Sequence, residues 1–171
     1  LGAAQLNALL DYLEAQQASS TAAFKFIVST VPFALGKVAD DTWSSYRTER
    51  EFILSEIESR GITNVAFLSG DRHFSAIYRI ISPGGYVYYD FLPSPAGQKT
   101  TSMPAGNPHP GEEEVVYASN DYKMFGNFEI DLSLETAPTP TLRVAFVDDG
   151  GTDQCVLTIG NDETGVLSGA P

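Results

Sequence analysis

The chain has 171 residues and a mass of 18.4 kDa, with 43% hydrophobic and 19% charged residues. The length is that of one domain, and the composition excludes a disordered chain. With 10 basic against 22 acidic residues, the net charge of −12 excludes a basic groove for nucleic acid. No apolar run approaches the ~20 residues that a membrane-spanning helix needs.

A helix is predicted over residues 1–17, because leucines recur there at the spacing of one helical face. These leucines are Leu6, Leu9, Leu10 and Leu13. A short strand rich in β-branched and aromatic residues follows over Phe24–Val31, and Pro32 ends it. Since a domain seldom opens directly on an amphipathic helix, we expect the chain to be a fragment, either a processed chain or the C-terminal part of a longer precursor.

A second helix is predicted over Trp43–Arg60, with Gly61 in the position just beyond a helix end that favours glycine. The apolar run Asn64–Leu68 predicts another buried strand. A strand, a helix and a strand at this spacing form a βαβ unit, in which the two strands pair in parallel.

From residue 74 onward the pattern predicts a mostly antiparallel set of strands separated by turns. The predicted strands are Phe74–Ile81, Tyr86–Leu92, Phe125–Leu134, Leu142–Val147 and Gln154–Ile159. A long loop rich in Pro, Gly, Ser and Thr is predicted over residues 94–114, and we expect its acidic run Glu112–Glu114 to be solvated. The single cysteine, Cys155, is expected to be buried in its strand.

The residues with the most chemistry directly follow the second buried strand, in the segment Leu68–His73 (LSGDRH). Ligands of open α/β sheets bind just beyond the carboxyl ends of parallel strands. Asp71 and His73 are two residues apart, so in an extended backbone their side chains point to the same side. A carboxylate and an imidazole together suit a divalent metal ion. The alternative is that Asp71 caps the next turn and His73 is an ordinary surface residue.

This motif is the fourth in an ordered series of segments that together resemble one known family. The segments are Leu1–Gln5 with Leu9, Leu10 and Leu13; Phe24–Ile27 with Val31–Phe33; Asp41–Tyr46 with Glu49 and Arg50; Asn64–His73; and, more weakly, Tyr89–Phe91, Ser94–Pro95 and Asn127–Phe128. The series resembles the C-terminal half of the alkaline phosphatase D (PhoD-like) family of calcineurin-like metallophosphoesterases.

The resemblance implies a mixed α/β (α+β) fold, with residues 1–171 forming the C-terminal part of one metallophosphoesterase domain. Residues 1–73 would contribute helix, strand, helix, strand and the metal motif, and residues 74–171 a strand-rich region. Together they would be half of a four-layer α/β/β/α sandwich. The implied activity is hydrolysis of phosphate monoesters or diesters by an exported, calcium- and iron-containing enzyme. Asp71 and His73 match the last two metal ligands of the family motif, whereas Arg72 between them is given no ligand role.

The rest of such a metal cluster is missing from this sequence, because it has no Asp-x-His, second Gly-Asp or Gly-Asn-His segment. The other histidine, His109, lies in the predicted long loop and is expected to face solvent. We therefore expect the chain to be inactive by itself and to pair with an N-terminal fragment of the same precursor that carries the remaining ligands. The alternative function is a non-catalytic, β-rich binding or structural module.

Two further groups of residues leave alternatives open. Phe33, Trp43 and Tyr46 are expected to be core or helix-anchoring aromatics, the alternative being the wall of a substrate pocket. The acidic segment Asp148–Asp153 lacks the alternating ligands and the distal Glu of an EF-hand loop, so it predicts a hairpin turn rather than a calcium site.

Overall fold

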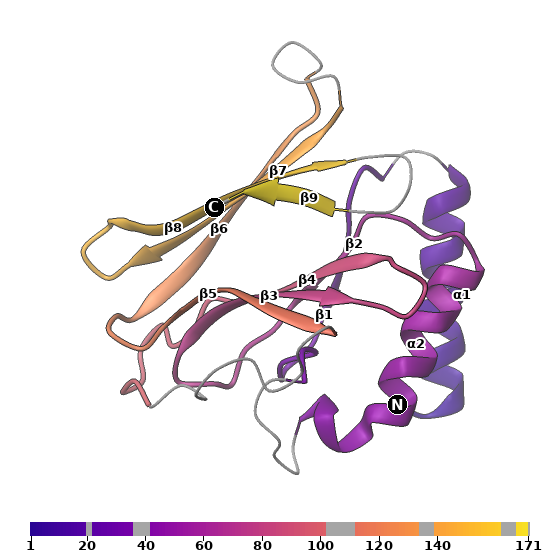
Figure 1. Cartoon of the computed structure of the whole chain (residues 1–171), viewed down its shortest axis with the longest axis horizontal. Helices are drawn as coiled ribbons and strands as arrows, with labels where there is room; N and C mark the ends of the chain where they lie inside the picture. The colour runs from indigo at the N-terminus through magenta and orange to yellow at the C-terminus, as the bar shows by residue number, and fades with distance from the viewer. Residues whose placement is uncertain (20–21, 36–41, 102–111, 134–138, 162–166, 171) are drawn as a thin grey trace.

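The computed structural model of the chain describes residues 1–19, 22–35, 42–101, 112–133, 139–161 and 167–170. A five-stranded sheet (sheet A) has two helices packed on one face and a four-stranded sheet (sheet B) on the other. In Figure 1 the helices lie side by side at one side of the molecule, away from sheet B. The mixed α/β fold predicted from the sequence is confirmed. No helix among the described residues covers the outer face of sheet B, so the fourth layer stays a prediction.

Both predicted helices are present. Helix α1 spans Ala3–Ser19 and buries Leu10 and Leu13. The second begins with a single 3-10 turn, η1 (Trp43–Tyr46), before the α-helix α2 (Arg47–Ser59). It ends at Ser59, and Gly61, with a φ of 62° in the left-handed region, lies just beyond the helix end as predicted. The amides of Gly61 and Ile62 donate to the carbonyls of Glu58 and Ile57, the reciprocal pattern of a glycine-terminated helix.

The strands of sheet A lie in the order β1-β2-β4-β3-β5. They span Lys25–Val28, Val65–Leu68, Val87–Leu92, Ser75–Ile81 and Glu113–Ser119, in that spatial order. Strands β1 and β2 pair in parallel across the α2 connection, which confirms the predicted βαβ unit. Strand β4 also pairs in parallel with β2, whereas β3 is antiparallel to both β4 and β5. β1 is shorter than predicted because the chain turns after Val28, where the Ser29 hydroxyl donates to the Val31 carbonyl at 2.6 Å.

Alternate residues of sheet A face two separate cores. In β2, Val65 and Phe67 pack against the helices, and Ala66 packs against sheet B. In β4, Tyr88 and Leu92 face the helices, and Tyr89 and Phe91 face sheet B. Because both faces are covered, these strands are almost continuously apolar, as is typical of parallel sheets.

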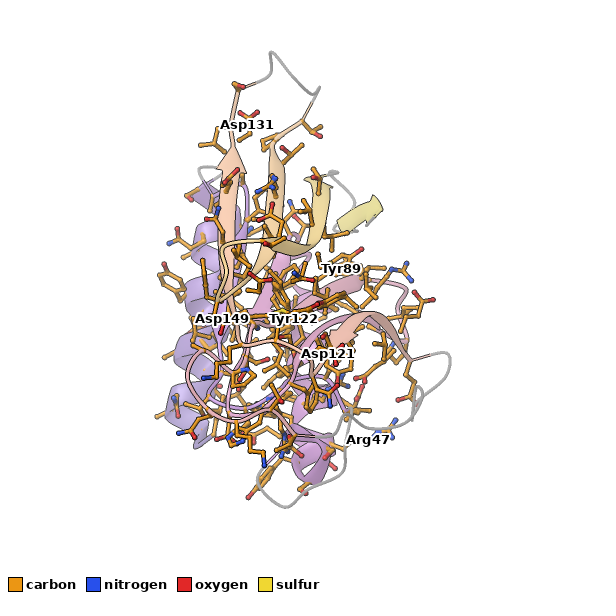
Figure 2. All side chains as sticks on the ribbon, turned by 90° about the vertical axis from the view of Figure 1, so that its left-hand side faces the viewer. Arg47, Tyr89, Asp121, Tyr122, Asp131 and Asp149 are labelled. Carbon is orange, nitrogen blue, oxygen red and sulfur yellow. The ribbon has the colours of Figure 1, made fainter. Side chains whose placement is uncertain are left out.

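Sheet B is antiparallel throughout and has the order β6-β7-β8-β9, with spans Met124–Asp131, Thr141–Asp148, Asp153–Asn161 and Leu167–Ala170. Its inner face carries Cys155, which is buried as predicted. Arg143 pairs with Glu129 and Asp153 across three strands. Figure 2 shows Asp131 at the end of β6, remote from Arg47 at the start of α2.

Two strands, β5 and β9, were not predicted, and one expectation is wrong. Two residues of the acidic run Glu112–Glu114, expected in a solvated loop, lie within β5, and Glu112 directly precedes it. Each of the three carboxylates forms an ion pair with an arginine: Glu112 with Arg47, Glu113 with Arg50 and Glu114 with Arg79. Glu113 is only 1% exposed. Arginine partners from distant elements therefore make strand pairing compatible with this acidic sequence.

The helix-side core predicts the effect of truncating Phe67. This ring is fully buried, and it stacks on Phe33 with 3.8 Å between ring centroids. Phe67→Ala should lower the free energy of unfolding by about 3–5 kcal/mol, because it removes a large side chain and leaves a cavity. Denaturant titration measures this loss. The matched control is Phe52→Ala in α2, where the side chain is 46% exposed, so its truncation should cost far less. Equal losses from the two substitutions would contradict this description of the core.

Candidate functional site

The carboxyl ends of β1 and β2 lie at one edge of sheet A, so the loops that leave these strands run next to each other. The Ser29 amide donates to the Leu68 carbonyl, and the Ser69 amide donates to the Phe91 carbonyl, both at 2.9 Å. A side chain at Gly70 would lie 3.7 Å from the carbonyl oxygen of Thr30. We call this region, formed by residues 29–35 and 69–73, the strand-end edge.

Asp71 and His73 both lie at the strand-end edge. Asp71 is exposed and His73 is half-buried. The backbone of Asp71 has a φ of 68°, in the left-handed region that residues other than glycine seldom occupy and that is found at functional sites. The extended backbone assumed in the sequence argument is therefore not formed, and simple alternation does not set the relative direction of the two side chains.

The backbone of this motif is held by the segment that follows β4. The Ser94 hydroxyl donates to the Arg72 carbonyl, and the Thr101 amide donates to the His73 carbonyl at 2.7 Å. The Ser75 hydroxyl in turn donates to the Ser94 carbonyl. These bonds connect the motif to residues 94–101, which follow it by more than twenty positions in the sequence.

The donors at the strand-end edge are suited to a divalent metal but do not complete a site. Asp71 offers carboxylate oxygens and His73 an imidazole nitrogen, which are ordinary metal ligands. In the part of the chain that the structure describes, no three His, Cys, Asp or Glu side chains gather where they could hold a metal ion. His109, expected to face solvent, lies outside the described residues.

Directly behind the edge lies the fully buried carboxylate of Asp90 in β4. Its Oδ1 accepts a hydrogen bond from the Ser69 hydroxyl at 2.7 Å. Its Oδ2 accepts two more, from the amides of Phe33 and Ala34, each at 2.8 Å. Burial raises the pKa of the Asp90 carboxyl, and these three hydrogen bonds act against that rise.

A second buried carboxylate, Glu113, continues this polar cluster. Its Oε1 accepts from the Leu35 amide and from Nη2 of Arg50, both at 2.7 Å. Arg50 also donates from Nε to the Phe33 carbonyl at 2.7 Å, and its guanidinium lies 5.2 Å from the centre of the Phe33 ring. The loop after β1 is thus held by charged groups from three elements, β4, β5 and α2.

An apolar cavity of about 580 Å³ lies beside the edge, between α1, β1 and η1. The aromatics Phe33, Trp43 and Tyr46 line it. Phe33 is a core residue, as expected, whereas Tyr46 is 59% exposed. Trp43 donates from its indole nitrogen to the Ser29 hydroxyl at 3.0 Å, which anchors η1 to the end of β1. Phe33 and Trp43 therefore combine a structural role with a place on the cavity wall. Tyr46 lines the cavity but is not the core residue that was expected.

The acidic segment Asp148–Asp153 forms a hairpin turn between β7 and β8, as predicted. Asp148 itself organises the turn: its Oδ1 accepts from the amides of Gly150 and Thr152, and its Oδ2 accepts from the Gln154 side chain. The carboxylate oxygens of Asp148 are therefore engaged by the protein. The next residue, Asp149, is exposed at this end of sheet B (Figure 2).

Comparison with known proteins agrees with this architecture. The model of the PhoD-like phosphatase family matches residues 1–139, and the chain therefore belongs to that family. One solved structure, described as the structure of PhoD, is similar to this fold with a TM-score of 0.61 and 18% sequence identity. The similarity covers 95% of this chain but only 34% of that one, so the chain spans about a third of its structural relative. No curated protein matches the sequence.

Sequence analysis identified Asp71 and His73 but missed the buried cluster behind them. One local indication was Asp90, the single charged residue in the otherwise apolar strand Val87–Leu92. Arg50 gave a second, since it occupies the buried face of α2 together with Ile53, Leu54 and Ile57. Neither residue reveals its partners from sequence, because the groups it contacts lie far away along the chain and several of them are backbone amides or carbonyls.

The turn at Asp148 predicts a pH-dependent stability. Hydrogen bonds, first from Thr152, lower the pKa of Asp148. The stabilisation that results is present above the unfolded pKa of about 3.9 and is lost as the pH falls through the lower folded value. Asp148→Asn should therefore lower the Tm at pH 7 by more than it does at pH 3. The matched control, Asp149→Asn, should change little at either pH, and a Tm difference for Asp148→Asn that does not depend on pH would count against this role.

Proposed function

We propose that this chain is the C-terminal part of a metal-dependent phosphoesterase that hydrolyses phosphate monoesters or diesters. The observation that carries the proposal is the family match over residues 1–139, which includes the motif Gly70–His73 at the carboxyl end of a parallel strand. This is the position at which α/β sheets bind their ligands.

In this function Asp71 and His73 hold metal through a carboxylate oxygen and an imidazole nitrogen. Bound metal ions supply a nucleophile by lowering the pKa of water, and they stabilise charge on the phosphoryl group. For His73 to act as a ligand its imidazole must be neutral, with the coordinating nitrogen free of a proton. The family resemblance implies iron and calcium as the metals, and an exported enzyme. No helix among the described residues has the length and apolarity to span a membrane.

The remaining ligands would come from an N-terminal segment of the same precursor. Three observations support this. The chain corresponds to 34% of its structural relative, and no third donor joins Asp71 and His73 among the described residues. Among the strands that the structure describes, β1 is also at an edge of sheet A.

That edge offers a place for such a segment to dock. The amides of Lys25 and Ser29 donate to the β2 side, so by strand alternation Phe26 and Val28 direct their backbone groups away from β2. Val28 is 77% exposed, and it also lines the apolar cavity. A strand added here would extend sheet A and place further side chains beside Asp71 and His73, while apolar groups of the added segment would fill the cavity.

The proposal predicts the effect of removing either ligand from the complete polypeptide. Asp71→Ala and His73→Ala should each lower the hydrolysis rate of p-nitrophenyl phosphate and of its bis-ester by at least about 100-fold. Loss of a ligand should exceed the 10–100-fold effect of losing a group that only orients one. Asp121→Ala, at an exposed turn, is the matched control and should retain activity. The 171-residue chain without its partner segment should be inactive.

Wild-type rates in both ligand variants would contradict the proposal. That result would favour the second candidate function, a non-catalytic binding or structural module, to which the incomplete donor set of the described residues also points.

A further inference from the structure

The buried carboxylate of Asp90 joins the two loops that make up the strand-end edge. Through Oδ1 it holds the hydroxyl of Ser69, the residue immediately before Gly70 and Asp71. Through Oδ2 it holds the amides of Phe33 and Ala34 in the loop after β1. We call this set of three hydrogen bonds the Asp90 clamp.

The clamp acts next to a contact between the two loops. The chain passes from Ser69 to Gly70, against which the Thr30 carbonyl oxygen lies. A shift of Ser69 would therefore move Gly70 toward or away from the neighbouring loop, and Asp71 is the next residue. The left-handed backbone of Asp71 leaves little tolerance for such a shift, since this region of backbone conformation is narrow.

Packing alone does not account for a carboxylate at this position. Asp90 has no exposed surface, and it lies on the same face of β4 as the buried residues Tyr88 and Leu92. Burying a carboxylate is costly even when it is hydrogen-bonded, and an apolar side chain of similar size would fill the space without that cost. The polar group is explained by the two loops it holds together.

Glu113 of β5 also holds the loop after β1, next to the residues that Asp90 holds. It binds the Leu35 amide, so three successive amides, of residues 33–35, are held by two buried carboxylates. Arg50 fixes the Phe33 carbonyl and neutralises Glu113. Because the loop after β1 is held in this way, the Asp90 carboxylate has a fixed position, and its bond to the Ser69 hydroxyl fixes the position of Ser69.

We propose that Asp90 is a positioning residue, which acts through Ser69 to set the geometry of Asp71 and His73 for metal binding. Asp90 is too deeply buried to touch substrate, and its oxygens are engaged by the protein. The metal-binding part of this inference rests on the proposed function, whereas the positioning of the loop does not.

Three substitutions separate the clamp from general stability. Ser69→Ala removes only the bond to Oδ1, and Asp90→Leu removes all three bonds. Asp90→Asn preserves them, because its carbonyl accepts from Phe33 and Ala34 while its amide donates to the Ser69 hydroxyl. The matched control is Ser82→Ala, which removes a buried hydroxyl bonded to Tyr86 in the turn between β3 and β4, at the opposite end of the sheet.

The first readout is the amide NMR spectrum of the 171-residue chain, recorded without metal. Ser69→Ala and Asp90→Leu should shift the resonances of Gly70–Phe74 and speed their hydrogen exchange, whereas Asp90→Asn and Ser82→Ala should leave them close to wild type. If Asp90→Leu does not fold, Ser69→Ala against Ser82→Ala decides the question. Unchanged resonances for Gly70–Phe74 in Ser69→Ala would overturn the positioning role.

The second readout is the dissociation constant for Mn²⁺, measured on the complete polypeptide by titration. Ser69→Ala should raise this constant by about 10–100-fold, the usual effect of losing a group that orients a ligand, and Asp90→Asn should leave it close to the wild-type value. An unchanged constant in Ser69→Ala, in a wild-type protein that binds Mn²⁺, would overturn the role in metal binding. A wild type that binds no Mn²⁺ would instead contradict the proposed function, and the NMR comparison would still decide whether the clamp positions the loop.

Discussion

Parallel pairing of β1 and β2 is the constraint on which the rest of this structure depends. It requires a crossover, which α2 supplies, and it brings the carboxyl ends of both strands to one edge of sheet A. The loops that follow β1 and β2 therefore lie next to each other, and their relative position has to be fixed by contacts. The buried carboxylates of Asp90 and Glu113 provide that restraint through backbone amides, with Arg50 balancing the charge. The motif Gly70–His73 then occupies a defined place at the surface.

Sequence reasoning succeeded where the determinants are local. The end of α2 at Gly61 follows from one glycine, and the βαβ unit follows from two apolar runs and the helix between them. It failed where burial depends on distant partners. Glu113 was expected to be solvated because its partner Arg50 lies 63 residues away in the sequence. Asp90 went unassigned because its partners are the amides of Phe33 and Ala34, 57 and 56 residues away, and a backbone amide carries no sequence signal.

The candidate site shows the same division. A short motif was enough to single out Asp71 and His73, since residue type and spacing are visible in sequence. Their backbone geometry was not, because the partners that bond the residues on either side of the left-handed Asp71, namely Asp90 and Ser94, lie far from it in the sequence. The fold thus places two donors at an edge that, within the described residues, has unpaired strand surface and an apolar cavity beside it. Both features fit an edge completed by another segment of a longer polypeptide.

Elemental analysis of purified protein tests this account most directly. The complete polypeptide and the 171-residue chain would be purified under the same conditions and compared by inductively coupled plasma mass spectrometry, each with and without His73→Ala. The account predicts stoichiometric metal in the complete wild type, little in its His73→Ala variant, and none above background in the isolated chain. Stoichiometric metal retained by the complete protein after His73→Ala would contradict it, because the strand-end edge would then not be where the metal binds.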